Sequence, residues 1–236
     1  MAVHDLFSVL PDARVRSVLQ RLHTEADRQA RGLLLHYLPK LPKLLLGGRM
    51  GFTEEQIRTF YADKYLPLSR NQAAFLHLTA RSMGARSIVE FGTSFGISTI
   101  WLAAVVRENG GGKVIGTELV PEKARRARAH VEEAGLSEYV EIREGNALDT
   151  LRDVEGPVDL FLNDGFPMLA LEMLKLMAPK MREGGVAVAN NVVTFKADYV
   201  EYMTYLEEPA NGFRSMVVPF EDGLAYSIRV RGREAA

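Results

Sequence analysis

The sequence predicts an α/β fold: a doubly wound, mostly parallel sheet of seven strands with an N-terminal helical extension. From residue 87 onward, short apolar segments rich in β-branched residues alternate with helical segments, as in a parallel sheet covered by helices. A glycine-rich turn follows the first of these segments, and a turn that suits a hairpin joins the last two. The 236 residues are enough for one sizeable core. We therefore expect residues 1–62 to form the extension and residues 63–236 to form one α/β domain.

Composition restricts the possible partners. Charged residues make up 25% of the chain and the net charge is −1, whereas binding to nucleic acid or a membrane surface favours a strong positive bias. The chain has no cysteine, which excludes disulfides, thiolate catalysis and cysteine-based zinc sites. No signal-peptide pattern and no membrane-spanning apolar segment is present. We expect a cytoplasmic protein with neither a nucleic-acid nor a membrane partner.

The N-terminal extension begins with a helical pattern. Apolar residues recur at spacings of three and four after Pro11, and the prolines Pro39 and Pro42 then end the helix. Glycines at positions 47, 48 and 51 provide a flexible joint. Three interpretations stay open: a lid over a ligand pocket, an arm of a homodimer, or a helix that only packs on the domain.

Two further helices have clear start signals. Thr53 with Gln56, and Ser69 with Gln72, fit the capping box, in which a hydroxyl and a glutamine side chain satisfy each other's backbone donors. The second helix covers about 69–83 and leads into the first strand.

The remaining elements follow in alternation. We expect strands at 88–91, 113–118, 139–143, 157–162, 186–189, 214–219 and 224–230. We expect helices at about 97–107, 121–134, 167–181 and 196–206. The turn at 221–223, Glu-Asp-Gly, suits a hairpin between the last two strands.

The turn after the first strand indicates a ligand. Gly92 and Gly96 permit a tight turn and close backbone approach, and the following helix presents free N–H groups. Glu118 ends the second strand, where nucleotide-binding folds hold ribose hydroxyls. A dinucleotide needs Gly-x-Gly-x-x-Gly, which is absent, and Glu90 would repel a pyrophosphate but suits an ammonium group. S-adenosylmethionine fits both ends, and the absent fingerprint argues against a nicotinamide dehydrogenase.

Polar residues follow the predicted strands at the edge where such sheets bind ligands. They are Glu90 to Ser94, Glu118, Asn146 with Ala147, Asp164, and Asn190 with Asn191. We expect them to form one site.

Residues 89–99 read VEFGTSFGIST, which resembles the first cofactor motif of class I S-adenosylmethionine-dependent methyltransferases. The sequence resembles more narrowly the O-methyltransferases that include the catechol and caffeoyl-CoA enzymes, from about Leu66 to Arg229. The resemblance implies a Rossmann-like methyltransferase fold and a set of cofactor-binding residues. These are Leu68, Ser69, Glu90, Gly92, Thr93, Ser94, Ser98, Glu118, Asn146, Ala147 and Asp164. For Ser69, a role as helix cap alone is equally open.

The acceptor side departs from that group. Its members usually hold a vicinal phenol on magnesium or a similar ion with two aspartates and an asparagine, and a lysine acts as base. Asp164 matches the first aspartate and Asn191 the asparagine, but Asn190 replaces the second aspartate and Pro167 the lysine. Asp164, Asn190 and Asn191 are therefore the catalytic candidates and the candidate ligands of a divalent metal. A weakly bound metal and a metal-free site both stay open.

Candidate bases for a metal-free site are Asp164, His36 and His77, whereas nothing selects His4, His23 or His130. The aromatic residues Phe166, Phe195, Tyr199 and Tyr202 would line the acceptor pocket or belong to the core.

We expect S-adenosylmethionine-dependent methyl transfer to an oxygen of a small-molecule acceptor, by a homodimer. Methyl transfer to nitrogen or carbon at a metal-free site, and a non-catalytic cofactor-binding protein, are the alternatives.

Overall fold

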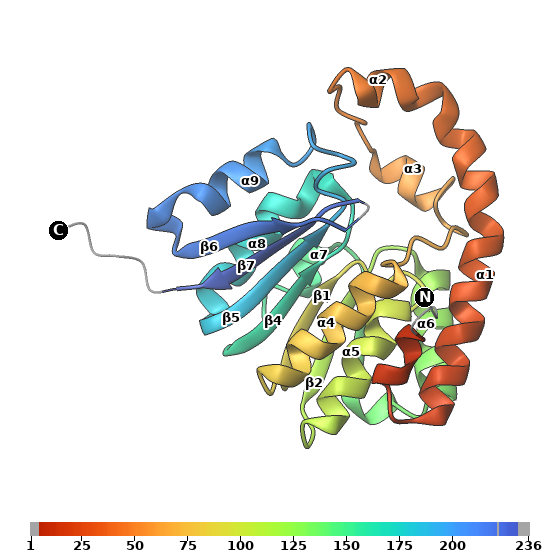
Figure 1. Cartoon of the computed structure of the whole chain (residues 1–236), viewed down its shortest axis with the longest axis vertical. Helices are drawn as coiled ribbons and strands as arrows, with labels where there is room; N and C mark the ends of the chain where they lie inside the picture. Colours follow the sequence, from red (N-terminus) through yellow and green to blue (C-terminus); the bar gives the residue numbers. More distant parts are fainter. Residues whose placement is uncertain (1–4, 221, 231–236) are drawn as a thin grey trace.

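The computed structural model describes residues 5–220 and 222–230, apart from the side chains of Arg31, Leu34 and Leu45. Its centre is a seven-stranded sheet in the order β3-β2-β1-β4-β5-β7-β6 (Figure 1). The strands are β1 Ser87–Phe91, β2 Lys113–Glu118, β3 Val140–Glu144, β4 Val158–Asn163, β5 Met181–Asn190, β6 Phe213–Val218 and β7 Leu224–Arg229. The first five pair in parallel, and β7 lies antiparallel between β5 and β6. The predicted α/β sheet and its closing hairpin are confirmed; of the turn at 221–223, Glu221 lies outside the described residues.

Helices follow most strands. The α-helices are α1 Ala13–Tyr37, α2 Leu41–Leu45, α3 Glu54–Arg58, α4 Arg70–Ser82, α5 Ile97–Glu108, α6 Pro121–Glu133, α7 Ala147–Thr150, α8 Ala170–Met177 and α9 Val200–Glu207. Short 3₁₀ segments are η1 Leu6–Val9, η2 Leu38–Lys40, η3 Ser137–Tyr139, η4 Pro167–Leu169, η5 Ala178–Lys180 and η6 Pro209–Asn211. Both predicted capping boxes are present, at Thr53 before α3 and at Ser69 before α4.

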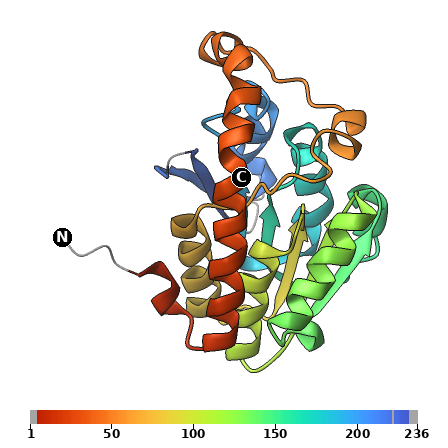
Figure 2. The ribbon, with the colours of Figure 1, turned by 90° about the vertical axis from the view of Figure 1, so that its right-hand side faces the viewer.

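The two faces of the sheet carry separate apolar clusters, because successive strand residues point to opposite faces. Ile88 of β1 and Leu160 of β4 join the cluster under α1, α4, α5 and α6. Val89 and Phe161, their neighbours in the sequence, join the cluster under α7, α8 and α9. Figures 1 and 2 show these two helical layers around the sheet. Burial on both faces explains why the central strands read as continuous apolar runs.

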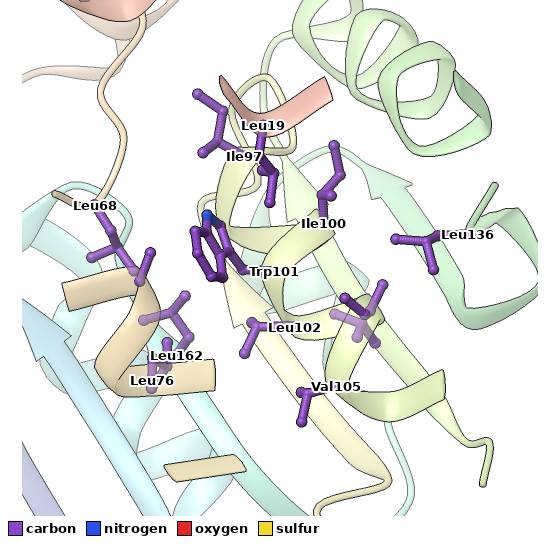
Figure 3. Close-up of a cluster of buried hydrophobic side chains, with 14 of the residues drawn as sticks. Leu19, Leu68, Leu76, Ile97, Ile100, Trp101, Leu102, Val105, Leu136 and Leu162 are labelled. Carbon is purple, nitrogen blue, oxygen red and sulfur yellow. The ribbon is translucent and has the colours of Figure 1, made fainter. Parts of the chain in front are cut away.

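The first cluster includes the extension. Trp101 of α5 lies among apolar side chains from α1, α4 and the sheet, including Leu19, Leu76 and Leu162 (Figure 3). The Phe7 ring stacks on the indole at 5.7 Å. The first half of α1 therefore packs in the same core as α4 and α5, while its far end runs beyond the sheet toward α2 and α3 (Figure 1). A domain boundary near residue 62 stays a prediction.

The structure differs from the predicted boundaries around β5. The helix expected over 167–181 is the shorter α8 between two 3₁₀ segments, and the strand begins at Met181 instead of after Gly185. The pairing of β4 with β5 shifts register here, between Val158 and Leu160. A Cβ at Gly185 would lie 2.9 Å from the carbonyl oxygen of Arg182, so the irregular strand needs glycine at that point.

The helix expected over 196–206 also begins late, at Val200. Turns precede it: the Phe195 N–H donates to the carbonyl of Asn191, and the Asp198 N–H to that of Phe195. These turns bring residues 191–199 over the end of β5, beside the site described next.

Candidate active site

A cavity opens at the carboxyl ends of β1, β2, β3 and β4. The strand order reverses between β1 and β4, and open α/β sheets bind ligands at such a switch point. Six of the eleven residues predicted to bind cofactor line this cavity. They are Gly92, Ser94, Glu118, Asn146, Ala147 and Asp164.

Gly92 lets the turn after β1 pass close to the end of β4. Its φ is +96°, and a Cβ there would lie 2.8 Å from the carbonyl oxygen of Asp164. The N–H groups of Gly92 and Thr93 both donate to the carbonyl of Thr117. The turn is thus fixed to β2 on one side and touches β4 on the other, so it shapes the cavity wall.

Glu118 is held at the mouth of this turn. One carboxylate oxygen accepts the Ser94 N–H at 2.7 Å, and the other accepts the Val120 N–H at 2.8 Å. The Ser94 backbone has a φ of +50°, and its buried Oγ has no hydrogen-bond partner among the described residues. A fixed carboxylate and an unpaired hydroxyl in one cavity fit a ligand with hydroxyl and polar groups.

Glu90 lies beneath the turn, fully buried. Its Oε2 accepts hydrogen bonds from the hydroxyls of Thr93, at 3.0 Å, and Thr99, while Oε1 has no partner among the described residues. Burial raises the pKa of Glu90, and the neighbouring hydroxyls of Ser98, Thr99 and Thr93 partly oppose this. Glu90, Thr93 and Ser98 do not line the cavity; they support the loop that does.

Leu68 and Ser69 also lie outside the cavity lining. Leu68 is buried in the cluster of Figure 3, and Ser69 caps α4. The segment approaches the site two residues earlier, where Leu66 lines the first cavity and also a second one.

The second cavity adjoins the first. The two share Leu66 and the segment Asp164 to Phe166. The extension contributes the wall residues Tyr37, Leu41, Leu44 and Phe52. Of the four predicted aromatic residues, Phe166, Phe195 and Tyr199 line it, whereas Tyr202 is buried in the cluster under α8 and α9.

Two carboxylates line this second cavity, Asp164 and Asp222, and no lysine, arginine or histidine among the described residues does. Burial, followed by the nearby charge of Glu90, raises the pKa of Asp164 well above its ordinary value. Burial and the charge of Asp164 likewise raise the pKa of Tyr199. The shared wall therefore carries an acid with a raised pKa between two cavities.

Asn190 ends β5 beside Asp164 and is buried. Its Oδ1 accepts the Asn191 N–H and the Nε2–H of Gln72, both at 2.8 Å. Its side chain also hydrogen-bonds to the Asp164 carboxylate and lowers the pKa of that acid, so the amide nitrogen faces Asp164. Asn191, at a φ of +62°, lines the second cavity.

These three residues do not fit the divalent cation that the resemblance implies. A hard dication prefers several oxygen ligands with carboxylate charge among them. Here there is one carboxylate, and Asn190 turns a donor toward it. The described part of the chain contains no group of three or more His, Cys, Asp and Glu residues that could hold a metal.

The predicted histidine bases lie elsewhere. His77 is buried in the core with its Nδ1 3.2 Å from the carbonyl oxygen of Trp101, and burial lowers its pKa. His36 stacks on Phe60 at 3.8 Å, and its Nε2 lies 2.6 Å from the Lys40 Nζ. Neither lines the second cavity, so of the three predicted bases Asp164 is the one on its wall. His4 lies outside the described residues.

Sequence reasoning missed the cavity-wall residue Phe52 and the role of Gln72, which lies outside both cavity linings. Phe52 packs edge-on against Phe166 and Phe195 at 5.2 and 5.3 Å. Gln72 was recognised only as part of a capping box. Phe52 lies in the extension and had no local signal, whereas the glycine-rich joint before it could have indicated a segment that reaches the site.

Comparisons with known proteins agree with this geometry. Residues 89–192 match a family described as a methyltransferase domain. A catechol O-methyltransferase of Niastella koreensis is 35% identical over 132 residues, covering 54% of this chain and 59% of that protein. The corresponding protein of Mycobacterium tuberculosis is 36% identical over 129 residues, covering 54% and 58%. The match thus spans less than two thirds of the length of these curated relatives.

Two solved structures are similar over more of their length. The O-methyltransferase of Bacillus cereus in complex with SAH is 26% identical with a TM-score of 0.65, covering 74% of this chain and 88% of that one. An O-methyltransferase of Streptomyces achromogenes involved in tomaymycin synthesis, in complex with SAM, is 27% identical with a TM-score of 0.61, covering 74% and 86%. None of the helices described between residues 5 and 230 could span a lipid bilayer.

Proposed function

We propose that this chain, a class I O-methyltransferase of the catechol and caffeoyl-CoA group, transfers a methyl group from S-adenosylmethionine to an oxygen of a small molecule. The junction of two cavities at Asp164 carries the proposal. A displacement reaction needs donor and acceptor held within attack distance, and two cavities that share a wall can hold them so.

The first cavity is the proposed cofactor site. Glu118 would bind the ribose hydroxyls, and Asn146 with Ala147 would border the adenine. Gly92 and Ser94 would contact the methionine part, on a loop supported by Glu90, Thr93 and Ser98. Leu68 and Ser69 would act indirectly, by fixing the segment that presents Leu66. Support comes from the lining of the cavity and from the SAH and SAM bound by the two similar structures.

The second cavity is the proposed acceptor site. S-adenosylmethionine supplies an electrophilic methyl group when bound. Asp164 faces both cavities and would accept the proton of the acceptor hydroxyl, while Asn190 fixes Asp164 and Asn191 contacts the acceptor. The aromatic wall favours a flat apolar acceptor, and two carboxylates without a cation disfavour an acidic one.

Methyl transfer to nitrogen is a second candidate, because the same two carboxylates would also attract an amine. Turnover of a matched panel of phenols and aromatic amines distinguishes the two. Turnover of neither by a protein that binds the cofactor would favour the non-catalytic alternative.

Calorimetric titration of S-adenosylmethionine into wild type and Glu118→Ala tests the cofactor site. Loss of charged hydrogen bonds to the ribose should weaken binding by about tenfold or more. Glu122→Ala is the matched control, because Glu122 pairs with Arg125 on the exposed face of α6 and should leave affinity unchanged. Equal affinity of Glu118→Ala and wild type would contradict the assignment.

We also propose a cytoplasmic homodimer. Leucines on the far end of α1 and on the segment after it are exposed, and a second copy of the chain would cover them. They are Leu35, Leu38 and Leu46.

A further inference from the structure

We infer that the site at Asp164 binds no divalent cation, and that the amide of Asn190, fixed by Gln72, holds the Asp164 carboxylate in its place. The inference about metal binding rests on the hydrogen bonds and does not depend on the proposed function. The role of the held carboxylate rests on the proposed function.

Backbone donors fix the orientation of both amides. The Asn191 N–H can only donate, so the Asn190 atom that it contacts at 2.8 Å must be the oxygen. The Ser69 N–H likewise identifies the Gln72 atom at 2.9 Å as its oxygen. Gln72 must therefore present its nitrogen to Asn190, and it does so at 2.8 Å. Neither the Gln72 amide nor the Asn190 amide can flip without placing two hydrogen-bond donors against each other.

This orientation determines what Asn190 presents to Asp164. With Oδ1 occupied by two donors, the group on the other side is the NH₂, which hydrogen-bonds to the carboxylate. A cation beside Asp164 would face these N–H dipoles at the distance where a ligand oxygen is required. Asn190 would have to break both bonds to its oxygen in order to ligate, and Asn190 is buried where water cannot replace them.

The hydrogen-bond chain performs a positioning role. It runs from the start of α4, through Gln72 and Asn190, to the end of β4, and so links three elements. Asp164, which is half-buried between the two cavities, thereby receives a hydrogen-bond donor. A carboxylate that is already oriented can bind an acceptor hydroxyl without a bridging ion.

The substitution Asn190→Asp would replace the N–H donor beside Asp164 by an oxygen. The first oxygen of the new carboxylate could keep the hydrogen bonds from Gln72 and Asn191, and its second oxygen would face Asp164. Two carboxylates would then lie together, with Asn191 on the same cavity wall, and carboxylate and amide oxygens are the ligands that a hard dication prefers. Asn190→Asp is therefore expected to create a metal site with little change elsewhere.

The test is titration of Mn²⁺ alone, followed by electron paramagnetic resonance, into wild type, Asn190→Asp and the control Asn211→Asp. Asn211 lies in η6, away from both cavities, and its substitution by aspartate adds the same negative charge as Asn190→Asp. We expect no binding up to about 1 mM by wild type or the control, and binding below that concentration by Asn190→Asp. Thermal unfolding checks that each variant folds.

Binding of Mn²⁺ by wild type below about 1 mM would overturn the inference, whether or not Asn190→Asp folds. A folded Asn190→Asp that binds no more Mn²⁺ than Asn211→Asp would overturn the orientation argument. Neither Mn²⁺ titration needs a methyl acceptor, so both results are independent of the proposed function. Methyl transfer by wild type should also survive excess chelator, and its loss under chelation would count against the inference.

Discussion

At Gly92, β1 ends within contact distance of the chain that follows β4. Replacement by alanine combines a positive φ with a Cβ 2.8 Å from backbone atoms of Asp164 and Gly165. We expect Gly92→Ala to destabilise the fold by about 3 kcal/mol and to abolish cofactor binding, because the wall of the first cavity must shift. Urea unfolding and calorimetry measure the two effects.

Gly84 provides the matched control for Gly92. It also has a positive φ, of +64°, but a Cβ there would meet nothing within 4 Å. Gly84→Ala should cost only backbone strain, about 1 kcal/mol, and leave cofactor affinity unchanged. Equal losses in the two variants would show that close approach is not what Gly92 provides.

Single residues were predictable where their chemistry is local. Gly92, Ser94 and Glu118 follow strands in recognisable patterns, and all three line the first cavity. The orientation of Asn190 was not predictable, because it depends on Gln72, which lies 118 positions away in the chain. Leu68 was placed by resemblance, and the chain reaches the site at Leu66 instead.

At the level of the elements, Asp159 ties three strands together. Its carboxylate accepts the N–H groups of Arg86 and Ser87 at the start of β1 and the Nε–H of Arg182 in β5. Burial alone would raise the pKa of Asp159, but Arg182 and the backbone donors lower it overall. The folded state thus keeps this group charged at a lower pH than the unfolded chain does.

Asp159→Ala should destabilise the fold by about 2 kcal/mol at neutral pH. Because the folded pKa is depressed, this stabilisation is complete above the ordinary pKa of about 4 and is lost as the pH falls through the folded pKa. The difference in urea midpoint between wild type and variant should therefore narrow as the pH falls below about 4. Asp153→Ala, at a side chain 78% exposed, should change stability by less than about 0.5 kcal/mol. A constant difference between wild type and Asp159→Ala from pH 7 to pH 3 would contradict this role.

Element boundaries were predictable where a local signal sets them. Both capping boxes fix helix starts within four residues of sequence, and both predictions are confirmed. The predicted boundary between α8 and β5 was wrong, because the start of β5 depends on its pairing with β4. A register shift in that pairing brings residues 181–185 into the sheet.

For the whole molecule, the exposed leucines lead to a prediction about assembly. Leu35 is 69% exposed and Leu46 is 88% exposed. We expect light scattering to give twice the 26.3 kDa mass of one chain for wild type, and a single-chain mass for Leu35→Glu with Leu46→Glu. Leu78→Glu, at an exposed leucine of α4, should leave the dimer intact. A wild type with the mass of one chain would refute the homodimer.

The alternation of strands and helices determined the architecture, since the order of elements alone predicts a parallel sheet with helices on both faces. The order of elements did not determine where the extension lies. The apolar stripe of α1 predicts only that one side of this helix packs against other residues, without indicating which ones. The structure shows its first half in the core with α4 and α5, while the segment that follows it lines the second cavity.

The position of Trp101 also provides an optical probe. The chain has one tryptophan, and it lies under the extension, with its indole N–H 3.4 Å from His23 of α1 and its ring stacked on Phe7. Its intrinsic fluorescence therefore originates at the junction between extension and domain. The emission maximum would shift to the red if the first half of α1 undocked, so detachment of the extension from the domain can be followed without attaching a dye.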